Sequence, residues 1–224
     1  MKRLSSKIAL SAVLAMALLT SCKDSHNGPT IDIYQNIVTF TANSGASAIF
    51  EYQELNDSPV IRLGIKGNID TEKYPAGTRM LMTYSLPDGI DYGENCNEVQ
   101  LRGLQTVYSG AATPLPFLQI QPLIKPVRLI TIYRTGHYIN FTANMPALDK
   151  RTYSLYADES TIGSPDVRLY LTTAVDADSP TYNATQTGSI DISDVWNATS
   201  TRSVTVTVDN SENPYRTEFT FSKL

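Results

Sequence analysis

The strictest constraint on the fold is a two-residue alternation near the C-terminus. Residues 203–208 read SVTVTV, which places three valines on one face of an extended chain and hydroxyl side chains on the other. Residues 217–221 (TEFTF) alternate in the same way, and the turn-forming run 209–214 (DNSENP) separates the two segments. This arrangement predicts a β-hairpin.

Strand-like periodicity continues through most of the chain, which favours an all-β fold. The strands expected in the C-terminal half are 128–133, 138–143, 152–156 and 167–171, in addition to the hairpin. The strands expected in the N-terminal half are 32–41, 48–53, 60–65, 79–86 and 98–108. Only residues 191–196 (DISDVW) could hold a helical turn. Five closely spaced strands suit a small barrel, closed or partly closed.

Four prolines, at positions 114, 116, 122 and 126, suggest where the chain divides. Proline removes a backbone donor from a β-ladder and favours extended segments, so residues 113–126 are expected to form a linker. It would join a barrel domain at 30–112 to a β-sandwich domain at 127–224. One continuous sandwich with a proline-rich crossing at its edge is the alternative.

The N-terminus has the composition of a secretory signal peptide. Lys2, Arg3 and Lys7 precede an apolar run at 8–19, which is too short to span a bilayer as a helix. Residues 19–22 (LTSC) resemble the lipobox of bacterial lipoproteins, and this resemblance implies that Cys22 carries lipid. We therefore expect a signal peptide at 1–21, a polar tether at 22–29, and a mature protein anchored to the membrane through Cys22.

Composition excludes several functional classes. The formal charge is −4, and it becomes −7 once residues 1–21 are removed with their three cations, which argues against nucleic acid as a partner. Cys96 would then be the lone thiol, without an internal disulfide. The two histidines, His26 and His137, are too few and too far apart to indicate a zinc site, and His137 is expected in a solvated turn. We expect no cofactor and no catalytic residue.

Two features leave alternatives open. Asp88, Asp91, Glu94 and Glu98 gather acid in one loop that could hold Ca²⁺, although solvated loop carboxylates are more common. The thirteen tyrosines could form a sugar-stacking platform, but tyrosine is also favoured on β-strands, and we prefer that second interpretation.

Several ordered segments resemble the NigD-like lipoproteins of Bacteroidetes. They are the lipobox at 19–22, YPAGTR at 74–79, the strand 80–86, residues 98–108, GHYINF at 136–141 and RTYSLYAD at 151–158. The resemblance implies an OB-like barrel followed by an immunoglobulin-like β-sandwich, in an outer-membrane lipoprotein of a gut or oral bacterium. It implies no shared enzymatic activity, and Cys22 is the only site residue that it transfers.

We therefore expect a monomeric, non-enzymatic binding or accessory module of the cell envelope, with a glycan or a protein as its ligand, in the periplasm or at the surface. A fimbrial or adhesin-like subunit is the alternative. Such subunits usually need a proteolytic arginine after the tether, and no arginine occurs between Cys22 and Arg62. An envelope hydrolase is a third possibility, for which no motif is present.

Overall fold

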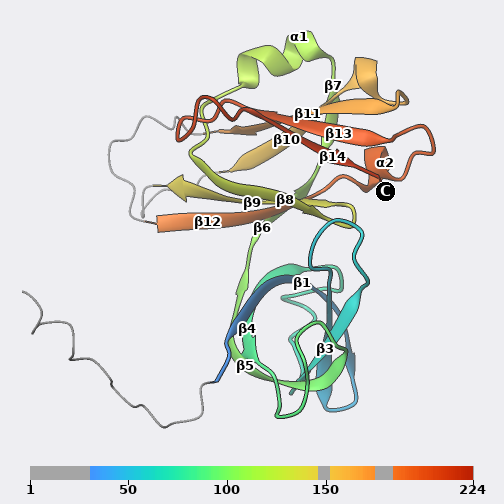
Figure 1. Ribbon diagram of the computed structural model, residues 1–224, viewed down its shortest axis with the longest axis vertical. Coiled ribbons are helices and arrows are strands. Elements are labelled where there is room, and N and C mark those ends of the chain that lie inside the picture. The colour runs from blue at the N-terminus through green and yellow to red at the C-terminus, as the bar shows by residue number, and fades with distance from the viewer. Residues whose placement is uncertain (1–30, 146–151, 175–183, 224) are drawn as a thin grey trace, which may run out of the picture. The chain divides into compact units, whose positions relative to one another are not determined.

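Five strands close into a barrel in the first half of the computed structural model, which describes residues 31–145, 152–174 and 184–223 (Figure 1). The strands are β1 (Tyr34–Ser44), β2 (Ser47–Tyr52), β3 (Ile61–Lys66), β4 (Arg79–Ser85) and β5 (Cys96–Thr106). Their order around the barrel is β1-β2-β3-β5-β4, and β1 also pairs with β4 to complete the circle. Only the β3–β5 pair is parallel, so the connectivity is OB-like, as predicted.

The barrel interior is filled by alternating apolar side chains. Phe40, Phe50 and Met82 are fully buried there, each on a different strand. Gly64 lies where β3 and β5 approach most closely, because a Cβ atom at this position would stand 2.2 Å from the carbonyl oxygen of Asn97. A glycine on β3 therefore allows the parallel pair to form and the barrel to close.

Two further sheets form a sandwich (Figure 1). Their strands are β6 (Tyr108–Ala111), β7 (Thr113–Leu115), β8 (Leu129–Thr135), β9 (Tyr138–Met145), β10 (Tyr153–Asp158), β11 (Asp166–Thr173), β12 (Ala184–Asp191), β13 (Ser203–Val208) and β14 (Glu218–Ser222). One sheet has the order β14-β13-β11-β10-β7 and the other β6-β12-β9-β8. Short helical segments are α1 (Phe117–Ile120), η1 (Gln121–Leu123), η2 (Glu159–Thr161) and α2 (Ser193–Trp196).

The two sheets bury one shared core. Val204 and Val206 on β13 belong to the same cluster as Ile139 and Phe141 on β9, although β13 and β9 lie in different sheets. Gly188 on β12 leaves room for this packing, since a Cβ atom there would stand 2.2 Å from the Phe141 ring. The all-β fold class, with a barrel before a sandwich, is confirmed.

The strongest local prediction is also confirmed. Strands β13 and β14 form an antiparallel hairpin in which Ser203 pairs with Ser222 and Val206 with Phe219. The helical turn expected within 191–196 is α2. The sandwich departs from simple hairpin pairing at three places, because β11–β13, β10–β7 and β12–β6 are parallel.

The segment expected to be a linker has regular structure instead. Within 113–126, β7 pairs with β10, and the side chain of Ile120 is fully buried. Just before it, β6 pairs with β12, so residues 108–115 supply one strand to each sheet of the sandwich. Pro114 is compatible with β7 because this strand lies at the edge of its sheet. Asp32–Leu224 make one compact unit, and the predicted signal peptide, Cys22 and the predicted tether lie outside the described residues.

Candidate binding site between barrel and sandwich

Arg79, the first residue of β4, reaches from the barrel into the sandwich. The turn before β4 places Arg79 at this position, and in that turn the Thr78 N–H donates to the Pro75 carbonyl. The Arg79 guanidinium donates from Nε to Ser189 Oγ (2.9 Å) and from Nη2 to Asn140 Oδ1 (3.2 Å), and both acceptors belong to the sandwich. Its Nη1 donates to Thr39 Oγ1 on β1 (2.8 Å). One side chain therefore links β1, β9 and β12.

Arg79 is only 6% exposed, and its guanidinium lies 4.1 Å from the centre of the Tyr138 ring. Burial lowers the pKa of Arg79 well below its usual value, to about 10. The group therefore stays cationic at neutral pH. All three of its hydrogen-bond acceptors are neutral, so the aromatic ring supplies part of the electrostatic compensation that a buried cation needs.

Arg134, on β8, makes the reciprocal connection from the sandwich to the barrel. Its side chain is fully buried and donates two hydrogen bonds to the Asp57 carboxylate, at 2.8 and 2.7 Å. It also donates to the Gly136 carbonyl and lies 4.0 Å from the Trp196 ring. Backbone hydrogen bonds run alongside, because Asn56 N–H donates to the Arg134 carbonyl (2.7 Å) and Gly136 N–H to the Asn56 carbonyl (2.6 Å).

The contact between barrel and sandwich around Arg79 and Arg134, called the junction below, brings together two segments that are far apart in the sequence. YPAGTR at 74–79 contributes Arg79, and GHYINF at 136–141 contributes both the Tyr138 ring and the Asn140 acceptor. From the sequence alone, the two segments are notable only because they resemble segments of the NigD-like lipoproteins. His137 was expected in a solvated turn; it is half-buried there, with its ring 4.3 Å from that of Tyr138.

The larger junction cavity, of about 400 Å³, is uncharged. Its walls consist of three glutamines, four threonines, one tyrosine and two aliphatic residues, from both the barrel and the sandwich. Gln35 and Gln105 come from the barrel, and Gln186 comes from β12. The Oε1 atom of Gln186 is buried and accepts no hydrogen bond from the described residues. An unsatisfied buried acceptor in a polar cavity is suited to a ligand hydroxyl or N–H group.

A smaller junction cavity, of about 190 Å³, is lined by charged and titratable side chains. Arg79, His137, Tyr138 and Glu51 all face it. The Glu51 carboxylate is already paired with Arg62 Nε, at 2.8 Å.

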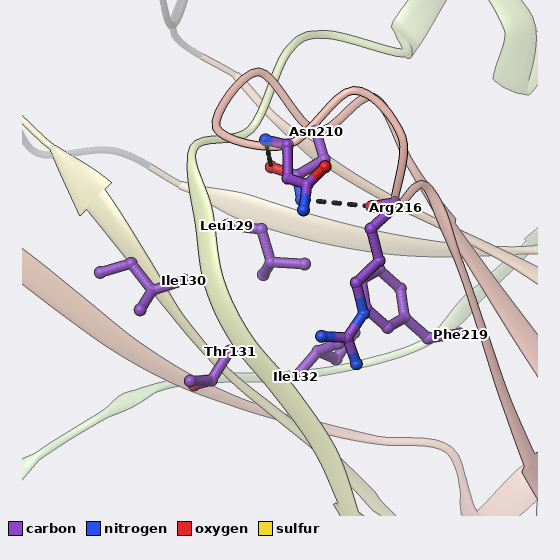
Figure 2. Close-up of a pocket in the computed structure, with 8 residues that line it drawn as sticks. Leu129, Ile130, Thr131, Ile132, Asn210, Arg216 and Phe219 are labelled. Carbon is purple, nitrogen blue, oxygen red and sulfur yellow. Dashed lines mark hydrogen bonds between the residues drawn. The ribbon is translucent and has the colours of Figure 1, made fainter.

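A third cavity, of about 220 Å³, lies within the sandwich, between edge strands β8 and β14 (Figure 2). Leu129, Ile132 and Phe219 provide its apolar walls, and the Arg216 guanidinium lies 5.1 Å from the Phe219 ring. The Asn210 amide closes one end by donating to the Arg216 carbonyl at 3.2 Å.

The remaining sequence candidates are dispersed. Asp88, Asp91, Glu94 and Glu98 are all exposed, and across the described ranges no group of three or more acidic, histidine or cysteine side chains is placed to hold a metal ion. Cys96 is buried, with its thiol 3.4 Å from the Glu98 carbonyl oxygen. His26 and Cys22 lie outside the described residues. Within the part of the chain that is described, no helix is long and apolar enough to span a bilayer.

The barrel-and-sandwich arrangement also occurs in solved structures from Bacteroides. A protein of unknown function from Bacteroides vulgatus ATCC 8482 has a TM-score of 0.60 at 14% identity, over 86% of this chain and 90% of that one. A NigD-like immunity protein from Bacteroides caccae ATCC 43185 has a TM-score of 0.51 at 15% identity, over 81% and 86%. A protein from Bacteroides fragilis NCTC 9343, provisionally described as a lipoprotein, has a TM-score of 0.53 at 14% identity, over 85% and 96%.

At these identities the likeness establishes the fold. The resemblance of the sequence to the NigD-like family is therefore supported by a NigD-like structure of the same architecture. No protein-family model and no curated protein sequence matches this chain.

Proposed function

We propose that this protein is a lipid-anchored, non-enzymatic binding module of the bacterial cell envelope, and that its ligand binds in the uncharged junction cavity. The anchor is the lipid on Cys22, with the short segment 23–29 as the tether. The lipobox supports this anchor. The shared fold of the Bacteroides fragilis protein that is provisionally described as a lipoprotein is consistent with it.

The observation that carries the proposal is the buried, unpartnered Gln186 Oε1 in a cavity with amide and hydroxyl walls. Such walls offer many hydrogen bonds and no charge, which suits a neutral, hydroxyl-rich ligand. A mono- or disaccharide unit of a glycan has this chemistry. Tyr108, which also lines the cavity, offers an aromatic surface for the apolar face of a sugar ring.

The two arginine connections support the same proposal through preorganisation. The cavity takes its walls from both barrel and sandwich, so its shape depends on how firmly they are held together. Arg79 extends from the barrel to the sandwich and Arg134 from the sandwich to the barrel, so the cost of ordering the site is met when the protein folds.

The test is glycan binding by the lipid-free mature chain. We expect neutral glycans to be retained on an array and recovered chemically unchanged. We expect Gln186→Leu to weaken binding by about tenfold or more, because a ligand hydroxyl loses its buried acceptor. The melting temperature should stay the same or rise, since the acceptor has no partner to lose in the free protein. Gln119→Leu, on the exposed face of α1, is the matched control.

Two results would count against the proposal. Equal affinity in the Gln186→Leu and Gln119→Leu variants would remove this cavity as the binding site. A lower melting temperature in Gln186→Leu, with no ligand retained by the parent protein, would make Gln186 a structural residue.

A further inference from the structure

The smaller junction cavity contains a buried cation, Arg79, which forms no ion pair with a carboxylate in the described ranges. Arg79 has five N–H donors, of which three are used by Ser189 Oγ, Thr39 Oγ1 and Asn140 Oδ1. Its three acceptors are neutral, and Asp191 is the one carboxylate that acts on it electrostatically, without a hydrogen bond between them. Buried charges are normally paired, so a cation in this position with donors to spare is suited to an anion.

The other walls are compatible with that occupant. The Thr135 hydroxyl accepts a hydrogen bond from Asn140 Nδ2 at 2.8 Å, which leaves its own O–H proton available to donate into the cavity. The side chains of His137 and Tyr138 also line the cavity, and both carry polar atoms. Donors from β4, β8 and β9 therefore converge on one space of about 190 Å³.

Glu51 is the one carboxylate that lines this cavity. Its charge is balanced by Arg62, whose Nε lies 2.8 Å from Glu51 Oε1. Arg79 forms no ion pair, so it supplies the cavity with positive charge, which Asp191 offsets only from beyond ion-pair distance. Glu51 nevertheless lowers the affinity for a second negative charge.

We propose that the cavity beside Arg79 binds a small oxyanion, either the carboxylate of a small organic acid or a phosphate group. Arg79 supplies the charge and the remaining N–H donors, and Thr135 supplies a hydroxyl donor. This site differs from the uncharged cavity proposed for the glycan, so either proposal can fail without the other.

Isothermal titration of the lipid-free mature chain with acetate, succinate and inorganic phosphate, at matched ionic strength, tests the site and separates the two sources of the anion. We expect saturable binding of one equivalent for at least one of them, with an increase in melting temperature that follows the occupancy. No saturable binding of any of the three at millimolar concentration would overturn the proposal.

The decisive variants change the repelling charge instead of Arg79, because Arg79 also holds the junction. Glu51→Gln should tighten anion binding by about three- to tenfold, since it removes the only carboxylate in the cavity. Glu54→Gln changes an exposed acid just beyond the same strand and should leave the affinity unchanged. Equal affinities in these two variants would place the anion elsewhere and overturn the proposal.

Discussion

The guanidinium of Arg134 and the carboxylate of Asp57 form two parallel hydrogen bonds, of 2.8 and 2.7 Å, between a strand of the sandwich and a loop of the barrel. The two ends are in different environments, because the Arg134 side chain is fully buried and that of Asp57 is 41% exposed. Loss of the carboxylate would leave the guanidinium buried without its counter-charge, whereas loss of the guanidinium would leave the carboxylate in contact with solvent.

Replacing Asp57 with alanine should destabilise the protein by about 1–3 kcal/mol, because Arg134 would be left buried without its counter-charge. Solvent reaches Asp57 and can replace part of the lost interaction, which keeps the effect below that of a fully buried pair. Chemical denaturation measures the change. Glu54→Ala, an exposed acid three residues away, should cost less than about 0.5 kcal/mol. Equal effects in the two variants would contradict the role given to Asp57.

Stability should decline in alkaline solution from about pH 10. Burial raises the pKa of four tyrosines, which are Tyr52, Tyr84, Tyr133 and Tyr138. Above the unfolded value of 10.0 the unfolded chain loses these protons first, so the free energy of unfolding falls as pH rises. Arg79 acts in the opposite direction, because its lowered pKa means that the unfolded chain holds more protons than the folded protein above about pH 10. Four tyrosines act against one arginine, and Lys73, whose pKa is raised by a hydrogen bond with Tyr74, acts with the tyrosines, so we expect a net decline.

Denaturant titrations at a series of alkaline pH values measure this decline. Tyr133→Phe should make it shallower, because one of the four contributing tyrosines is removed. Tyr215→Phe is the control, since Tyr215 is 99% exposed, and it should leave the slope unchanged. A slope that Tyr133→Phe does not alter would refute the assignment.

Gly188→Ala should cost about 1–3 kcal/mol, because the new methyl group would overlap the fully buried Phe141 ring, which has little room to move. Gly110→Ala on the neighbouring strand β6 should be almost neutral, since no atom beyond its chain neighbours lies within 4 Å of the place that its Cβ atom would take. Thermal denaturation of the two variants compares the same chemical change on paired strands. A larger loss of stability in Gly110→Ala than in Gly188→Ala would contradict the predicted overlap with the Phe141 ring.

Cys22→Ser should release the protein from the membrane fraction, because the lipid would have no thiol to attach to. Fractionation after metabolic labelling with a fatty acid measures this. Cys96→Ser should leave both the label and the location unchanged, since Cys96 is a buried residue of the barrel. Continued labelling of the Cys22→Ser variant would refute lipidation at this position.

The sequence predicts the strands better than it predicts their partners. Alternating valines at 203–208 indicate a half-buried strand and, with the turn that follows, its hairpin with β14. The same alternation carries no information about the other edge of β13, which pairs in parallel with β11. Prolines at 113–126 indicate interrupted pairing, but they do not distinguish a linker from an edge strand, where one proline is tolerated.

The candidate site is the least predictable part. Gln35, Gln105 and Gln186 are ordinary polar residues on exposed-looking strand faces, and they meet only because the barrel and the sandwich are apposed. Such a cavity needs no enzyme motif, so no local spacing points to it. An arginine directly after a turn and before an apolar strand, as at Arg79, is the one local signal that could have indicated a buried junction cation.

The positions of β6 and β7 determine whether the barrel and the sandwich can be separated by recombination during evolution. The chain leaves the barrel and immediately places one strand in each sheet of the sandwich. Recombination after β7 would give a new partner domain a sandwich that lacks β6 and β7, so that β12 and β10 would become open edges. Barrel and sandwich are therefore expected to be exchanged, duplicated and lost together, as a single genetic cassette.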